Sequence, residues 1–342
     1  MRRVSATGLL TALAGLALLV YVVWRVGLNE IASDVRVVGW RLLLVIAIGG
    51  LRFLLRAIAW RLCLEPPHTL TVGRAFAAVI GGDTIGNLTP LGPLVGEPAK
   101  AALVRDRLPL GPAVTALAIE NVLYTLSAAA MIAAGAIALL LRFQLPPAIR
   151  GIGEASIAAT LVLFAAALAL LWRQPALVSR ALSFAPRLAK YADRVRALES
   201  EVYSFASRRR RVMPALAAVE VGFHALGVAE AYLTLALIPD APLSWFTAFM
   251  FEATNRFITV AFKFVPLRLG VDEAATVLLT RQILGIGASV GLVAAIVRRV
   301  RVLFWAVAGG LVLVSKGLTP GTLRATSPSQ PSRSGPEDRL TG

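Results

Sequence analysis

Charged residues inside long apolar segments are the residues of this chain best placed to do chemistry. Arg52 and Arg56 lie four residues apart in the apolar segment 40–64, so they share one face of a helix. If that segment crosses a membrane, each buried guanidinium costs at least about 2.5–3.5 kcal/mol and needs a compensating partner. A phosphate or another lipid head group, held by two hydrogen bonds, would be one such partner. Ion pairs with Glu97, Glu220 or Glu230 would be another, and both interpretations stay open at this point.

A second set of charges lies in the segment 246–266, where Glu252, Arg256 and Lys263 fall on one helix face. Glu252 and Arg256 are one turn apart and can neutralise each other. Lys263 has no acidic neighbour at that spacing, which favours a role in binding. Arg256 and Lys263 are therefore both candidate contacts of an anionic head group.

Two glutamates stand beside helix breakers at corresponding positions. Glu97 follows Gly96, and Glu273 follows Asp272, each near the expected start of a short helix. A carboxylate at that place is favourable by itself, because a helix N-terminus carries partial positive charge. The alternatives are an ion pair with a buried arginine and a site for a proton or cation that is coupled to transport.

The last apolar segment, 286–314, is interrupted by three arginines within 298–301. One interpretation is a single long tilted helix with arginines at depth, and the other is a basic loop between two short elements. Glu120 and Asn121 lie at the same depth of an earlier apolar segment, which favours the long helix.

The composition shows which elements must position these residues. Of 342 residues, 57% are hydrophobic and only 16% are charged, against about 25% in soluble domains. With a mean hydropathy of +0.74, the chain is predicted to be an integral membrane protein. The net charge of +16 is then explained by topology and anionic lipids, so nucleic acid is not expected as a partner. The single cysteine, the absence of metal-ligand spacing and the absence of enzyme motifs predict no metal, no cofactor and no enzymatic activity.

The expected fold is an all-α polytopic membrane protein with eight to ten hydrophobic helices. A spanning helix needs roughly 20 apolar residues. Six full spans are predicted, at 6–26, 40–64, 110–141, 152–172, 213–238 and 286–314. Between them, the regions 70–107 and 246–284 are each predicted to form a broken or re-entrant helical hairpin, because glycine, proline and charges interrupt their apolar sequence.

The two broken regions belong to a predicted internal duplication with units at about 40–141 and 216–317. Aligning Pro90 with Pro266 also aligns the two glutamates described above. An odd number of predicted crossings separates the units, so the repeats are expected to be inverted. Inverted repeats with paired discontinuous helices are typical of transporters, which bind their substrate near the midplane.

Loop charge predicts the orientation in the membrane. The segment 173–212 contains many basic residues, including the run Arg208–Arg211, and is therefore expected in the cytoplasm. Counting the spans in both directions also places the N- and C-termini there. Residues 1–317 are expected to form one transmembrane domain, and the polar residues 318–342 a disordered cytoplasmic tail.

The first broken region contains motifs that resemble a known family. Its sequence includes Gly86-Asn87-Leu88-Thr89-Pro90 and Val95-Gly96-Glu97-Pro98-Ala99-Lys100. These runs are similar to the Asn-x-x-Pro and Gly-Glu-x-x-Arg patterns of the flippase-like transmembrane family, the transmembrane region of lysylphosphatidylglycerol synthase. The second region, from Pro266 to Glu273, resembles that family's later Pro-x-x-x-Gly-x-x-Glu element, and Arg298 or Arg299 fits the arginine that follows. The resemblance covers roughly 6–317.

Three positions depart from the family's pattern. Lys100 replaces the usual arginine, which keeps the charge but loses the bidentate fork. Asn121 stands where the family often has an arginine after Glu120, and Tyr124 stands where an aspartate is common.

The resemblance implies that the protein moves a lipid between the leaflets of the bacterial inner membrane, as a standalone member without the aminoacyl-transferase domain. Together with the residues above, it gives the expected head-group contacts Arg52, Arg56, Asn87, Lys100, Arg256, Lys263 and Arg298. The expected coupling or ion-pair residues are Glu97, Glu120 and Glu273. Two rivals stay open: a secondary transporter of a small anion, and a non-catalytic membrane subunit that docks a lipid-modifying enzyme or glycosyltransferase through 173–212. The sequence specifies neither the lipid nor the oligomeric state.

Overall fold

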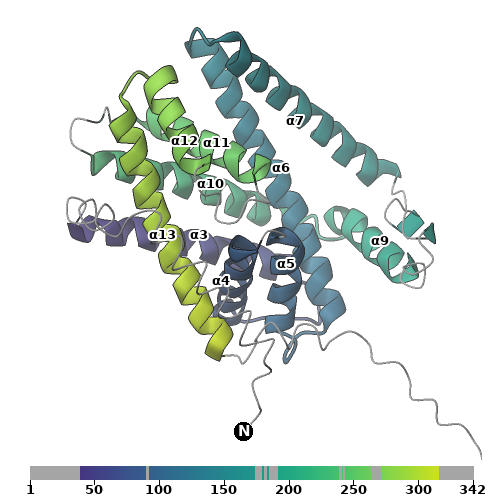
Figure 1. The fold of residues 1–342 in the computed structure, drawn as a ribbon. Coiled ribbons are helices and arrows are strands. Elements are labelled where there is room, and N and C mark those ends of the chain that lie inside the picture. Colours follow the sequence, from purple (N-terminus) through teal and green to yellow (C-terminus); the bar gives the residue numbers. More distant parts are fainter. Residues whose placement is uncertain are drawn as a thin grey trace, which may run out of the picture.

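The computed structural model describes residues 39–89, 92–173, 179–180, 183–184, 192–238, 241, 243–262 and 271–315. Every regular element in these ranges is helical (Figure 1). The predicted span 6–26, the tail 318–342 and the candidate ligand Lys263 lie outside the described residues.

In chain order the described helices are η1 (Gly39–Arg41), α3 (Leu42–Cys63), α4 (Val72–Leu88), α5 (Gly92–Leu103), α6 (Leu110–Arg142), α7 (Pro147–Arg173), α9 (Ala192–Arg208), α10 (Met213–Ala236), α11 (Trp245–Ala261), α12 (Val271–Leu278), η4 (Leu279–Ile283) and α13 (Ala288–Ser315). The element η4 is one turn of π-helix that continues α12.

Four of these helical segments are long and apolar enough to cross a membrane. They are Gly39–Cys63, Leu110–Arg142, Pro147–Leu170 and Met213–Ala236, and they coincide with four of the predicted spans. The fifth predicted span in the described residues, 286–314, is the unbroken helix α13. Of the two interpretations of its arginines, the long helix is therefore correct and the basic loop is wrong.

Both broken regions contain a helix of 17 residues followed by a shorter helical segment. In the first region, α4 and α5 pack closely because glycines stand where they meet. A Cβ atom on Gly96 would lie 2.8 Å from the carbonyl oxygen of Gly82 and 3.2 Å from the Cα atom of Gly86. The backbones can approach this closely only because these residues have no side chain.

The starts of the two short helices differ from the expectation in one respect. Glu273 lies in the first turn of α12, as predicted. By contrast, α5 begins at Gly92, and its first turn contains no acidic residue. The prediction that a helix N-terminus stabilises Glu97 is therefore wrong. The charge of Glu97 needs another partner.

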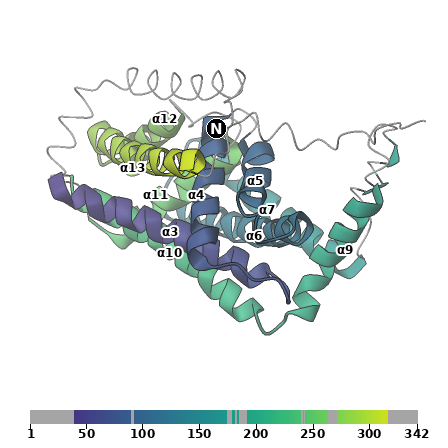
Figure 2. The same cartoon turned by 90° about the horizontal axis from the view of Figure 1, so that it is seen from below.

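The helices pack in an arrangement in which the two halves of the chain alternate. α3 packs beside α10, α4 packs against α13, and α11 packs against α6 (Figures 1 and 2). The long helices α6 and α13 run in opposite directions in Figure 1, where α6 rises from the lower to the upper part of the view and α13 descends.

Two apolar clusters lie at either end of α10, and a polar stretch separates them. Leu216 belongs to a cluster that includes Trp60 and Leu108, whereas Leu235 belongs to one that includes Phe251. Between Leu216 and Leu235, α10 buries two glutamates and Phe223. The buried glutamates of α10 therefore lie between the two apolar clusters, in the middle of the helix.

Candidate functional site

A cavity of about 350 Å³ lies among seven helices, and α3, α4, α5, α6, α10, α11 and α13 all line it. Its wall contains five cationic side chains, which are Arg52, Arg56, Lys100, Arg256 and Arg301. The acidic side chains on the same wall are Asp83 and Glu97. The cations thus outnumber the carboxylates at the surface of this cavity.

Arg52 is the most buried of the cavity arginines, with 4% of its surface exposed. Its Nη1 atom lies 3.1 Å from Glu230 Oε2, and its Nη2 atom lies 2.9 Å from Glu252 Oε1. Two further arginines share these carboxylates: Arg256 Nε lies 2.9 Å from Glu252 Oε1, and Arg301 Nε lies 3.0 Å from Glu230 Oε1. The three guanidiniums and two carboxylates form one connected cluster.

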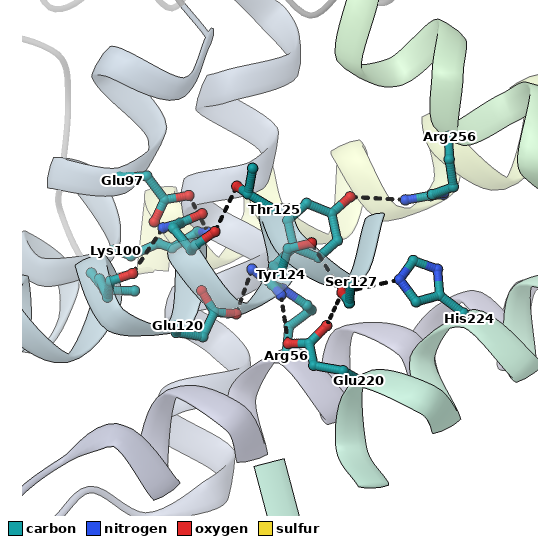
Figure 3. A network of polar contacts seen from close by, with 12 residues as sticks. Arg56, Glu97, Lys100, Glu120, Tyr124, Thr125, Ser127, Glu220, His224 and Arg256 are labelled. Atoms are coloured by element: carbon teal, nitrogen blue, oxygen red, sulfur yellow. Dashed lines mark hydrogen bonds and ion pairs between the residues drawn. The ribbon is translucent and has the colours of Figure 1, made fainter. Parts of the chain in front are cut away.

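Arg56, one turn further along α3, lies between two other glutamates (Figure 3). Its Nη2 atom is 2.5 Å from Glu120 Oε1, and its Nη1 atom donates to Glu220 Oε1 at 3.4 Å. The hydroxyl of Ser127 donates to Glu220 Oε2 at 2.8 Å. His224 Nε2 lies 3.1 Å from the same hydroxyl. This second cluster contains one cation and two carboxylates.

Two aromatic rings connect the clusters. The ring centroid of Phe223 lies 4.5, 5.9 and 5.4 Å from the Cζ atoms of Arg52, Arg56 and Arg256. Tyr124 receives a hydrogen bond of 2.9 Å from Arg256 Nη1, and the Cζ atom of Arg56 lies 4.0 Å from its ring centroid. Cation–π contacts of this kind help to hold guanidiniums in place when they are desolvated.

The α4–α5 hairpin forms another part of the cavity wall. Lys100 Nζ donates to Glu97 Oε1 at 2.6 Å, and Asn87 Nδ2 donates to Asp83 Oδ2 at 2.7 Å. The Glu97–Lys100 pair also appears in Figure 3. The glycines of this hairpin line the cavity as well, so the close helix packing and the cavity shape depend on the same residues.

The arrangement of charge is asymmetric. The carboxylates of Glu120, Glu220, Glu230 and Glu252 are all buried and do not line the cavity, whereas their arginine partners do. An anionic group in the cavity would therefore meet guanidiniums first, with the carboxylates behind them. Guanidiniums present paired donors that suit phosphate and carboxylate groups.

The cavity brings together six of the ten residues selected from sequence. These are Arg52, Arg56, Asn87, Lys100, Arg256 and Glu97. Glu120 lies behind Arg56, and Glu273 pairs with Arg299. Arg298 lines a separate space of about 10 Å³ beside Glu230 and Glu252, enough for one water molecule. The ion-pair interpretation of the buried arginines is confirmed for Arg52, Arg56 and Arg256.

The cavity residues that were not selected from sequence include Asp83, Tyr124, Phe223 and Arg301. Asp83 precedes Asn87 by one helical turn, and this spacing could have indicated it. Arg301 lies three residues after Arg298 on α13, so the choice between them depended on the rotation of that helix. Phe223 gives no sequence signal, because a phenylalanine in an apolar helix looks like any core residue.

Comparison with known proteins assigns the chain to a family. Residues 6–310 match the family described as the lysylphosphatidylglycerol synthase TM region. Neither the curated proteins nor the solved structures gave a match. The match and the apolar helices together show a multi-pass helical membrane protein that is tied to lipid handling. Because the match covers most of its length, the chain belongs to the family of the lysylphosphatidylglycerol synthase transmembrane region.

Proposed function

We propose that this protein moves a lipid with an anionic head group between the two leaflets of the bacterial inner membrane. The observation that carries the proposal is the cavity wall, on which five cations face inward while four carboxylates lie behind the arginines. The head group would occupy the cavity and the acyl chains would stay in the surrounding lipid. No step of this mechanism makes or breaks a covalent bond, so the proposed role is not enzymatic.

An inverted duplication is part of the proposal, because it would let the cavity open alternately to either side. Two observations support it. The helices α4 and α11 have equal lengths at equivalent places in the two halves. The opposite directions of α6 and α13 agree with the inversion.

The sharpest test removes cavity cations without leaving a buried carboxylate unpaired. In Arg256→Gln, Glu252 keeps Arg52 as a partner, and in Arg301→Gln, Glu230 keeps Arg52. The matched control is Arg150→Gln, because Arg150 lies on α7 with 67% of its side chain exposed. All three variants lose one positive charge, but only two of them change the cavity.

We expect both cavity variants to retain phosphatidylglycerol about 10-fold to 100-fold less well than the wild type, because a charge-assisted hydrogen bond contributes about 1.5–3 kcal/mol. Native mass spectrometry measures the retention. A dithionite-quenching assay with fluorescent phosphatidylglycerol in proteoliposomes measures transfer between leaflets, which should slow in the same two variants. Equal retention and equal transfer in all four proteins would contradict the proposal.

The same experiment distinguishes a transporter of small anions. Sulfate carries two charges but no acyl chain, so it should not displace phosphatidylglycerol at millimolar concentration if the cavity is built for a lipid. Displacement by sulfate, with no leaflet transfer by the wild type, would favour the small-anion transporter.

A further inference from the structure

Eight of the charged residues in and beside the cavity wall form two ion-paired groups of opposite net charge. The first, called the arginine-rich group, consists of Arg52, Arg256, Arg301, Glu230 and Glu252. The second, called the glutamate-rich group, consists of Arg56, Glu120 and Glu220. When all members are ionised, the first group has one excess positive charge and the second has one excess negative charge.

These two excess charges compensate each other over a short distance. Tyr124 contacts both groups, since its hydroxyl accepts from Arg256 and its ring lies beside Arg56. Phe223 also contacts arginines of both groups. The two groups together are neutral, and uncompensated charge is expensive in a buried environment. A ligand that changes the charge of one group must therefore affect the other.

Within the glutamate-rich group, the carboxylate of Glu120 has fewer hydrogen-bonding partners than that of Glu220. Both oxygens of Glu220 have partners, which are Arg56 and Ser127. Glu120 is 2% exposed, and among the described residues its Oε1 atom has one ion-pair partner, again Arg56. Its Oε2 atom is buried and accepts no hydrogen bond within the described part of the chain.

The other charged and titratable groups near Glu120 do not compensate the excess negative charge of the glutamate-rich group. Arg56 of α3 is shared with Glu220 of α10. Lys100 of α5 is paired with Glu97 of the same helix, so together they add no net charge. Cys63 of α3 also lies near Glu120 and is neutral as a thiol, and Arg256 of α11 is hydrogen-bonded to Tyr124. His224 of α10 contacts Ser127, which in turn donates to Glu220.

We propose that Glu120 takes up a proton when an anionic head group binds to the arginine-rich group, which makes this protein a proton-coupled carrier. This inference rests on the proposed function and extends it. The head group neutralises the excess positive charge of the arginine-rich group. The excess negative charge of the glutamate-rich group is then uncompensated, and a proton on Glu120 restores neutrality. The lipid head group and the proton would thus be carried together without net charge.

Coupling of this kind is reciprocal. If head-group binding favours protonation of Glu120, protonation of Glu120 must strengthen head-group binding by the same factor. A proton gradient could then bias the direction of lipid movement. Glu120 acts here through Arg56 and Tyr124 as a proton-binding residue and does not touch the head group.

The experiment measures proton uptake during lipid binding. The full chain in mild detergent is titrated with short-chain phosphatidylglycerol at neutral pH, in weakly buffered solution that contains a pH indicator dye. The phosphodiester stays ionised under these conditions, so any proton taken up binds to the protein. Short-chain phosphatidylcholine, which has no net charge, is the ligand control, and native mass spectrometry reports the amount bound.

We expect about one proton per phosphatidylglycerol bound by the wild type, as the linkage requires. Glu120→Gln should still bind the lipid but take up no proton. Glu154→Gln, an exposed change of the same kind on α7, should behave as the wild type. Binding without proton uptake in the wild type, or unchanged uptake in Glu120→Gln, would overturn the proposal.

Failure of the proposed function gives a different result. If the wild type binds no phosphatidylglycerol, both proposals fail and the binding measurement shows it directly. If it binds and transfers the lipid without a proton, only the coupling fails. Should Glu120→Gln not fold, infrared difference spectra of the wild type with and without lipid replace it: a new carboxylic-acid C=O band supports the proposal, and its absence overturns it.

Discussion

Arg52 and Arg301 line the same cavity, yet they differ in the number of buried carboxylates that each one neutralises. Arg52 contacts both carboxylates of the arginine-rich group, whereas Arg301 contacts only Glu230, which Arg52 also neutralises. Removing one partner of a buried ion pair costs about 3–5 kcal/mol, because the remaining charge stays buried. We therefore expect Arg52→Gln to lower stability by about that amount and Arg301→Gln to lower it by much less. Thermal unfolding in detergent, followed by light scattering and tryptophan fluorescence, measures both, and equal losses would contradict the assignment of Arg52 as the structural arginine.

For single residues, the sequence predicts that a buried charge needs a partner but does not identify that partner. The cost of burying Arg52 and Arg56 predicted that each needs a partner, and each has two. The partners themselves were not predictable beyond a short set of candidates. Arg56 and Glu120 are 64 positions apart on different helices, and no local rule brings them together.

At the scale of elements, the α4–α5 hairpin joins helix packing to cavity shape. A Cβ atom on Gly96 would meet backbone atoms of α4, which cannot rotate away as a side chain can. Gly96→Ala should therefore push the two helices apart, at a cost of about 1–3 kcal/mol, and enlarge the cavity. Gly73→Ala on α4 is the matched control, since no atom lies within 4 Å of its Cβ position. Thermal unfolding and phosphatidylglycerol retention together measure the effect, and equal values for both variants would argue against this packing.

The long elements were predictable because composition and length specify them almost alone. The predicted span 110–141 coincides with Leu110–Arg142, and 213–238 with Met213–Ala236. The start of α5 was expected near Glu97, which is too late, because the helix begins at Gly92 and also contains Pro98. The glycines Gly92 and Gly96 suit this place because α4 packs closely against the same turns.

For the whole molecule, contacts between the ends of helices indicate which connections share a side of the membrane. Arg208 pairs with Glu65 at 2.9 Å, and Thr115 donates to Glu201 at 3.0 Å. The basic residues that follow α9 therefore lie where α3 ends and α6 begins. With 33 residues, α6 is about 50 Å long and exceeds the hydrocarbon core of roughly 30 Å. At its far end, Phe143 stacks on Phe246 at the start of α11, with ring centroids 6.3 Å apart.

These contacts place the start of α4 and the start of α11 at opposite ends of the molecule, as an inverted repeat requires. Single cysteines in a Cys63→Ala background test this in intact cells with a membrane-impermeant maleimide. Arg107→Cys and Arg210→Cys should react only after permeabilisation, because the positive-inside rule places their side in the cytoplasm. Gln144→Cys and Gln282→Cys should react at once. Arg107 precedes α6 and Gln282 precedes α13, so equal labelling of these two would show parallel repeats and remove the basis for alternating access.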